Sequence, residues 1–219
     1  MNLRQMRQEV MNLCPDGSYD ADTVDEYINQ CLIYSAAEVA IPSLKRLGVV
    51  TTVVGREYVS IGTIEGYAFN GVLRRVSDSD GNEATIHENL EALMNRWPSM
   101  DNTGDVTDVA LEGNMLWYQK SPSVAENLTL VYYSNPDRLT ADADTPEHFP
   151  EHLHRKLFVN GAAWMIWDQK EEGVDQQKPN TVNYFFHSFD ERNKHSGITK
   201  LREHFARRRV HHISSVWSY

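Results

Sequence analysis

The hydrophobic residues of this 219-residue chain change their spacing twice. Near the start, Leu3, Met6 and Val10 recur at the spacing of one helix face. From Val49 onward, β-branched runs separated by glycines are typical of strands, and helical spacing returns after Pro150. The sequence therefore predicts an α+β protein in which a helical core carries a central β-rich insertion.

Both ends of the chain are expected to supply helices of this core. The second N-terminal helix begins near Thr23, where Thr23 and Glu26 match a capping box, and Pro42 limits it. Two long C-terminal helices are expected after Pro150, which suits a first helical turn, and Gly197 would weaken the middle of the second. The apolar face expected for the second N-terminal helix consists of Val24, Ile28, Cys31, Ser35 and Val39.

The middle of the chain is expected to be mostly strand. A polar turn is predicted at 78–82, a short helix near 88–96 and an exposed loop at 99–108. The predicted strands cover residues 49–54, 57–61, 72–76, 115–119 and 128–134. The expected domain limits are 1–46 and 149–209 for the two parts of the helical core, 47–135 for the insertion and 210–219 for an extended C-terminal tail.

Charge is distributed unevenly along the chain. A net charge of −10 disfavours binding of nucleic acid through the whole surface. Residues 78–112 carry nine acids against Arg96 alone, whereas residues 200–209 carry five bases against Glu203. Two cysteines without a metal motif indicate a reduced, intracellular setting, and no apolar run approaches the roughly 20 residues of a membrane span. We expect a protein of the cytoplasm that does not associate with membranes.

Three histidines, His148, His152 and His154, are the candidate metal ligands. Two histidines four residues apart can face one ion from a helix, but Pro150 lies between His148 and His152 and places His148 outside the helix. We favour a histidine-rich helix entry at the surface, with neither metal nor cofactor. A histidine–metal hydrolase is the third candidate function.

Acidic turns and serines give little support to other chemistry. Asp78 with Asp80, and Asp142 with Asp144, resemble the start of a calcium loop, but the required spacing to a bidentate glutamate is absent. Solvated turns are therefore expected at both places. No serine lies in a strained strand-to-helix elbow, and the chain is not expected to be an enzyme.

Three interpretations fit the basic and aromatic C-terminus. Arg207, Arg208 and Arg209, with Trp217 and Tyr219, could form a nucleic-acid footprint with stacking platforms. The arginines could also be a solvated helix end that interacts with the helix dipole. Arginine and aromatic residues together dominate the binding energy of protein interfaces, and we favour a partner-binding tail.

Several motifs, each weak alone, follow one another in a fixed order along most of the chain. The helix opening at 24–30 is followed by the strand pair that ends at 130–133. A crossing at 136–146 with the pattern Leu-Thr-x-Asp-x-Asp then leads to Pro150 and the helix that contains residues 161–164. In this order, over most of the chain, the sequence resembles the head-to-tail adaptor proteins of tailed bacteriophages, also called connector, head-completion or tail accessory proteins.

The resemblance implies a structural neck protein of the virion, between capsid and tail, made in the host cytoplasm. A twelve-subunit ring would dock on the portal protein, extend the channel through which genomic DNA passes without specific binding, and receive a tail or nozzle protein. In this family the C-terminal segment commonly reaches the portal. The resemblance therefore implies that the portal-binding residues are Arg207, Arg208, Arg209, Trp217 and Tyr219. The alternative function is a nucleic-acid-binding protein that uses the basic C-terminal segment.

Overall fold

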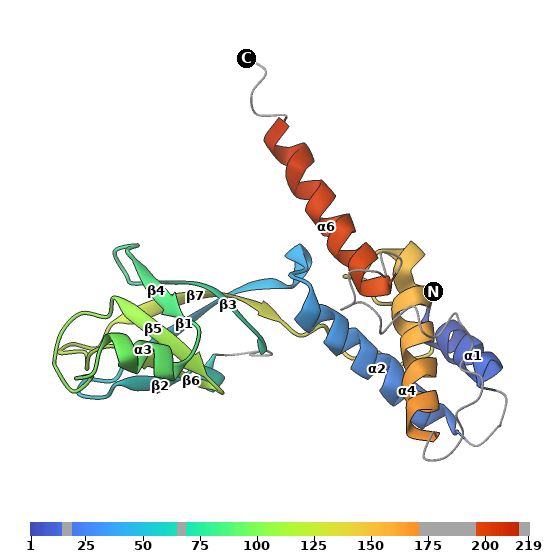
Figure 1. Ribbon diagram of the computed structural model, residues 1–219, viewed down its shortest axis with the longest axis horizontal. Helices are drawn as coiled ribbons and strands as arrows, with labels where there is room; N and C mark the ends of the chain where they lie inside the picture. The colour runs from blue at the N-terminus through green and yellow to red at the C-terminus, as the bar shows by residue number, and fades with distance from the viewer. Residues whose placement is uncertain (15–18, 65–68, 171–195, 215–219) are drawn as a thin grey trace. The chain divides into compact units, whose positions relative to one another are not determined.

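The chain forms two compact units (Figure 1). Unit 1 comprises Met1–Ser43 and Asn135–Tyr219, and unit 2 comprises Leu44–Ser134. The domain limits expected from the sequence remain predictions, because compactness alone does not show which part folds independently. The computed structural model describes residues 1–14, 19–64, 69–170 and 196–214.

Unit 1 begins with two capped helices. Helix α1 (Leu3–Leu13) starts with a capping box at Asn2. Helix α2 (Ala21–Glu38) starts at Asp20, whose carboxylate accepts a hydrogen bond from the backbone nitrogen of Thr23 at 2.8 Å. The capping box expected at Thr23 is therefore wrong. The helix already begins before Thr23, because the carboxylate of Asp20 caps it one turn earlier.

The core of unit 1 forms where α2 packs against α1 and α4 (Asn160–Lys170). All five residues of the apolar face predicted for α2 are buried, so that face is confirmed. Small residues at the start of α4, Gly161, Ala162 and Ala163, are buried, and side chains of this size allow helix backbones to approach closely. The other buried residues of this core include Leu3, Met6, Val10, Leu32, Phe158, Ala162, Ala163 and Ile166.

The predicted helical core with two long C-terminal helices is wrong, although the α+β class fits. After Pro150 the chain forms a 3-10 turn, η3 (Glu151–Leu153), and then a π-helical turn, η4 (Arg155–Val159). Only then does α4 begin, and it is 11 residues long. The three kinds of helix place apolar residues at similar intervals, so hydrophobic spacing does not distinguish them.

The second expected C-terminal helix also differs from the prediction. Its proposed first half, with Val182 and three phenylalanines, lies outside the described residues. Helix α6 (Gly197–Ser214) has Gly197 at its start and not in its middle. A Cβ atom at residue 197 would lie 3.0 Å from Cδ2 of Leu157 and 3.3 Å from the carbonyl oxygen of Lys156. Glycine thus permits the close approach of α6 to η4.

Polar contacts hold the proline- and aspartate-rich crossing against the N-terminal helices. The Asn29 side chain donates to the carbonyl oxygen of Leu139 at 3.0 Å and accepts from its backbone nitrogen at 2.8 Å. Arg7 pairs with Asp25 at 2.5 Å and with Asp142 at 2.9 Å. Hydrogen bonding to Asp25 raises the pKa of Arg7 above its ordinary value. These contacts fix the segment that carries the Leu-Thr-x-Asp-x-Asp pattern.

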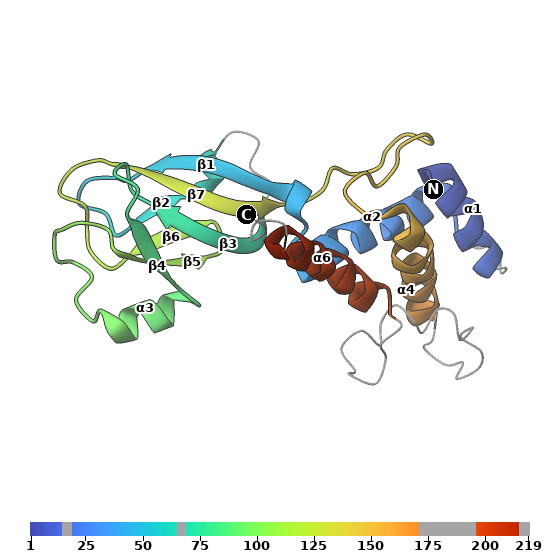
Figure 2. The same ribbon diagram turned by 90° about the horizontal axis from the view of Figure 1, so that it is seen from above.

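Unit 2 is a curled, mixed sheet of seven strands in the order β1-β7-β3-β4-β5-β6-β2 (Figure 2). The strands β4 and β5 pair in parallel, and the other neighbouring pairs are antiparallel. Strands β1 and β2 therefore lie at the two edges of the sheet. The strands are β1 (Lys45–Thr51), β2 (Tyr58–Ser60), β3 (Phe69–Ser77), β4 (Glu83–His87), β5 (Asp108–Glu112), β6 (Met115–Tyr118) and β7 (Asn127–Ser134).

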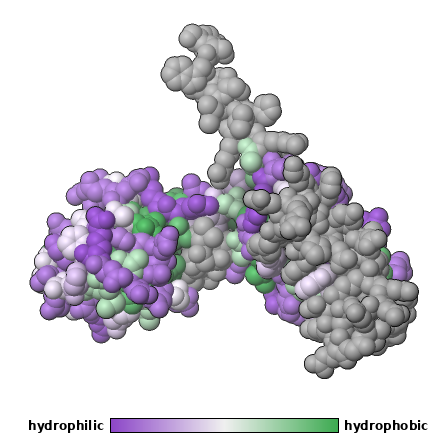
Figure 3. Space-filling view, viewed as in Figure 1, coloured by the Kyte–Doolittle hydropathy of each residue, from purple (hydrophilic) through white to green (hydrophobic). Residues whose placement is uncertain are grey.

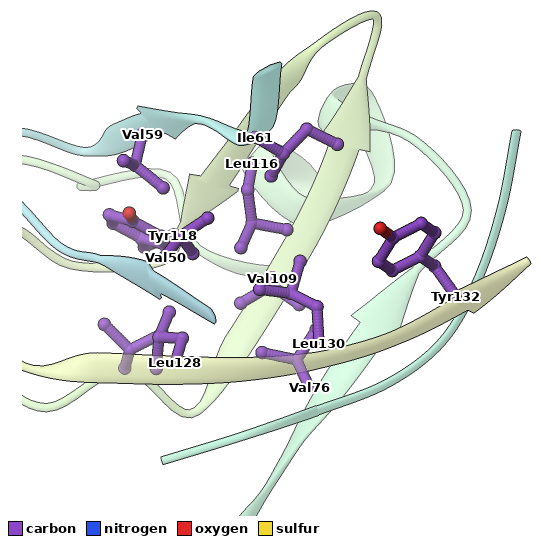
Figure 4. Packing of buried hydrophobic residues seen from close by; sticks show 11 residues of the cluster. Val50, Val59, Ile61, Val76, Val109, Leu116, Tyr118, Leu128, Leu130 and Tyr132 are labelled. Carbon is purple, nitrogen blue, oxygen red and sulfur yellow. The ribbon is translucent and has the colours of Figure 1, made fainter. Parts of the chain in front are cut away.

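The inner face of the curled sheet encloses the core of unit 2 (Figure 4). Val50 of β1 lies opposite Leu128 of β7, and both side chains are buried. Tyr118 of β6 is fully buried beside them, and burial raises the pKa of its hydroxyl. Because successive side chains of a strand point to opposite faces, this register directs Leu47 and Val49 of β1 outward.

Five of the seven strands overlap with the strands predicted from sequence, and two were missed. The short helix and the polar turn are confirmed as α3 (Leu90–Arg96) and the β3–β4 turn. The missed strands, β4 and β5, are short and flanked by acids, which weakens the local strand signal. The loop predicted at 99–108 is exposed over most of its length, but its end is wrong: Val106 and Asp108 are buried where β5 begins.

Candidate interaction surfaces

The C-terminal helix α6 is fixed to unit 1 at its first turns. Ser196 is buried, and its hydroxyl oxygen accepts a hydrogen bond from the backbone nitrogen of Thr199 at 3.1 Å, which caps the helix. Ile198 and Leu201 are fully buried. Arg202 pairs with Glu38 at the end of α2, with 2.7 Å between the charged atoms. The first turns of α6 therefore have both apolar and ionic anchors.

The residues predicted to contact the portal follow this anchored part. Arg207, Arg208 and Arg209 belong to α6, which continues to Ser214, but their side chains lie outside the described part of the structure. Trp217 and Tyr219 lie outside the described residues altogether. Their assignment to partner binding stays a prediction.

Two of the three candidate metal ligands, His148 and His154, have separate hydrogen-bond partners. Nδ1 of His148 lies 3.1 Å from the hydroxyl of Ser43. Both ring nitrogens of His154 are engaged, one 3.2 Å from the amine of Met1 and the other 3.0 Å from the carbonyl oxygen of Phe149. Burial lowers the pKa of His154, which favours the neutral ring. His154 therefore has no ring nitrogen available to join the other two candidate ligands.

His152 and His148 both line a hollow of about 680 Å³ on unit 1, and His154 does not. The ring of His152 is 5.7 Å from that of His204 on α6, measured between ring centres. Phe205 also lines the hollow, so the histidine-rich segment and α6 meet there. Within the ranges that the structure describes, no group of three or more His, Cys, Asp or Glu side chains could hold a metal ion.

The two acidic turns use their carboxylates to hold their own backbones. Asp78 accepts hydrogen bonds from the backbone nitrogens of Asp80 and Asn82, at 2.9 and 2.8 Å. Asp144 accepts in the same way from Thr140 and Ala141, at 2.7 and 2.8 Å. The side-chain amide of Asn82, together with these backbone groups, lowers the pKa of Asp78, and the backbone hydrogen bonds lower the pKa of Asp144. Both segments are turns, as the sequence predicted.

An exposed apolar face on unit 2 was not foreseen. Leu47 and Val49 of the edge strand β1 are 72% and 55% exposed, and Val131 lies directly opposite Leu47 on β7. Val53 and Val54, just after β1, are also exposed. Figure 3 shows hydrophobic surface over the strands of unit 2 within a largely hydrophilic surface. The sequence predicted a strand that includes Val49, but it did not show which side chains of that strand point inward.

Charge on unit 2 is separated between two of its surfaces. Lys45 and Arg46, at the start of β1, are both exposed, and Lys45 shares the face of Leu47 and Val49. Glu88 and Glu91, at the start of α3, are exposed beside Met94, which is itself half exposed. Figure 2 shows α3 on the side of unit 2 away from β1, and α3 packs against β4 and β5.

A family model of SU10 adaptor proteins matches residues 1–206. This match covers most of unit 1, all of unit 2 and the anchored turns of α6. The chain belongs to the SU10 adaptor protein family. No curated protein matches the sequence.

Membership in the SU10 adaptor family agrees with the resemblance to phage adaptor proteins and makes this chain a structural adaptor. For an SU10 adaptor, the surfaces described above are the relevant candidate sites, because an adaptor acts by contact with other proteins. No helix within the described ranges is long and apolar enough to cross a membrane.

Proposed function

We propose that this SU10-family adaptor is a neck protein of a tailed bacteriophage. Twelve copies would form a ring that docks on the portal protein, between the capsid and the tail. The ring would extend the DNA channel and provide the attachment site for a tail or nozzle protein. The protein would be made in the host cytoplasm and would act by assembly, without catalysis.

The observation that carries this proposal is the family match from residue 1 to residue 206. It includes both compact units, so the whole architecture, and not one shared motif, supports the assignment. The Leu-Thr-x-Asp-x-Asp crossing, on which the phage resemblance depends, is held in place by Asn29 and Arg7.

Helix α6 is the proposed portal-binding element. Its first turns are anchored on unit 1 by Ile198, Leu201 and the Arg202–Glu38 pair. The positive charges of Arg207, Arg208 and Arg209 follow directly along the same helix. With the first turns of α6 fixed, the arginine-rich end of the chain would become ordered only on the portal. The conformational entropy lost in this ordering costs a few kcal/mol, which would limit ring assembly before the portal is present.

The acidic composition fits a DNA conduit. With a net charge of −10, the channel wall would repel phosphates, so DNA would pass without adhering. The alternative, a nucleic-acid-binding protein that uses the basic C-terminus, makes the opposite prediction. Its binding to DNA must be measurable and must weaken steeply as salt rises.

Deletion of residues 210–219 tests the role of the C-terminus. We expect a folded protein, whose circular dichroism spectrum loses only the small helical contribution of the end of α6, that no longer joins portal rings in a sedimentation or mass measurement. A second variant, in which Arg207, Arg208 and Arg209 become Glu, should lose attachment as well. Undiminished attachment of both variants would reject this role for the segment.

A direct test of the function uses the full chain with portal protein. We expect ring-shaped particles in micrographs and a mass that corresponds to a closed ring on the portal. Parallel titrations with double- and single-stranded DNA at two salt concentrations should show no salt-sensitive binding. Salt-sensitive binding to DNA without attachment to portal would favour the alternative function.

A further inference from the structure

The edge strand β1 combines an apolar face with positive charge. Leu47 and Val49 are among the most exposed large hydrophobic residues within the described ranges. Lys45 and Arg46 directly precede them, and β1 contains no acid. Strand β1 is hydrogen-bonded on one side only, to β7, and β2 lies near it where the sheet curls. Exposed apolar faces of this kind are sites at which protein surfaces associate.

Two acids at the start of helix α3 lie beside an exposed apolar side chain of that helix. The buried residue of α3, Leu93, fixes the helix against the sheet, and Met94 is 50% exposed. Glu88 and Glu91 lie exposed next to it, and neither forms an ion pair with a described residue. The sequence from β4 to β5 is rich in acids, with Arg96 as its one basic residue.

We propose that the β1 face of one copy binds the α3 face of the next copy in the ring. This inference rests on the proposed ring and names the two surfaces that close it. Lys45, on the same face of β1 as Leu47 and Val49, would approach Glu88 and Glu91 of the neighbour, and Arg46 adds positive charge at the start of the strand. Leu47 and Val49 would pack against Met94 of the neighbour.

The partner of the β1 face is inferred to be a second copy of the chain, arranged head to tail, because the α3 face of that copy carries the opposite charge. A rotationally closed ring brings two different faces of each subunit into contact. The β1 and α3 faces lie on different sides of unit 2 and carry opposite charge (Figure 2). A two-fold dimer would instead place β1 against β1, and the repulsion between like charges would oppose it.

Charge reversal and its compensation test this contact. The variants are K45E/R46E on β1, E88K/E91K at the start of α3, and the chain that carries all four changes. The variant D137K/E147K is the control, because it reverses two exposed acids of unit 1 and changes the net charge as much as E88K/E91K does. Each full chain is mixed with portal protein, and the number of adaptor copies per portal is measured by mass.

We expect each two-residue reversal to weaken ring closure by about tenfold or more, with partly filled portals as the result. The four-residue variant restores opposite charges at every contact and should fill the portal like the original chain. Full rings from both two-residue variants would overturn the proposed contact. So would a folded four-residue variant that fails to recover, or a control that fails as they do.

The outcomes separate this inference from the proposed function. If the original chain forms rings on the portal and the variants do so equally, the function stands and the β1–α3 contact is wrong. If the original chain never joins the portal, the proposed function itself is wrong, and the contact inferred from it falls too.

Discussion

Nε2 of His87 lies 2.8 Å from a carboxylate oxygen of Asp108, across the parallel pair of strands β4 and β5. The second carboxylate oxygen accepts a hydrogen bond from the Thr107 hydroxyl at 2.9 Å. The side chain of Gln119 accepts from the backbone nitrogen of Asp108 at 3.0 Å. Asp108 is 5% exposed, so this network stabilises the two strands that the sequence did not reveal.

Replacement of Asp108 by Asn should therefore destabilise unit 2. We expect a loss of about 1–3 kcal/mol in the free energy of unfolding at pH 7, because a buried charge-assisted hydrogen bond is removed. Urea unfolding measures this loss. The substitution D101N, in the exposed loop before β5, is the control and should change stability little.

The same carboxyl group predicts a dependence on pH. Burial alone would raise the pKa of Asp108, but the hydrogen bonds from His87 and Thr107 outweigh burial and hold the pKa below its ordinary 3.8. Its contribution is thus complete above pH 3.8 and is lost as the pH falls through the lower folded value. The difference in free energy of unfolding between the original chain and D108N should therefore shrink as the pH falls below 3.8. A difference that stays constant down to pH 2 would contradict this assignment.

Replacement of Asn29 by Leu should loosen the crossing that leads into Pro150. The substitution leaves the buried backbone nitrogen and oxygen of Leu139 without their partner. We expect a cost of about 2–4 kcal/mol in chemical denaturation, since each orphaned buried group carries a desolvation penalty. Gln30→Leu is the matched control, because residue 30 is exposed on the same helix. Equal effects of the two substitutions would show that the clamp contributes nothing specific.

Replacement of Gly197 by Ala should weaken the docking of α6. The added Cβ would lie 3.0 Å from Leu157 and 3.3 Å from backbone atoms of Lys156, which cannot easily move. We expect faster amide hydrogen exchange in α6 and a loss of about 1–3 kcal/mol. Gly62→Ala is the control, because its Cβ would meet only the hydroxyl of Ser60 at 3.5 Å. Unchanged exchange in α6 would show that the close approach is not needed.

Replacement of Gly48 by Ala should strain the core of unit 2. The added Cβ would lie 2.8 Å from Cδ1 of Ile64 and 3.2 Å from the Tyr132 ring. We expect a lower melting temperature, by an amount that corresponds to about 1–3 kcal/mol. The second substitution Ile64→Val removes the nearest atom, so it should recover part of the loss. A double variant no more stable than Gly48→Ala would place the strain elsewhere.

Elements with a strong local pattern were predicted, and elements that depend on distant partners were not. The apolar face of α2 was found because Val24, Ile28 and Cys31 repeat at helical spacing. Strands β4 and β5 were missed because they are short and acidic, and pairing with each other and with Gln119 stabilises them. The prediction of long C-terminal helices was wrong at η3 and η4. There the backbone hydrogen-bonding pattern changes from one kind of helix to another, but the spacing of apolar residues hardly changes.

The sequence by itself determined the α+β class, the N-terminal helices, most of the strands and the likeness to phage adaptors. These features depend on local periodicity, turn residues and the order of motifs, and all three can be read directly from the amino-acid sequence. Only the tertiary structure decided that Leu47 and Val49 face outward and that acids gather at α3 on the other side of unit 2. The inner and outer faces of a strand exchange with a shift of one residue, so register, and hence surface, is set by long-range pairing.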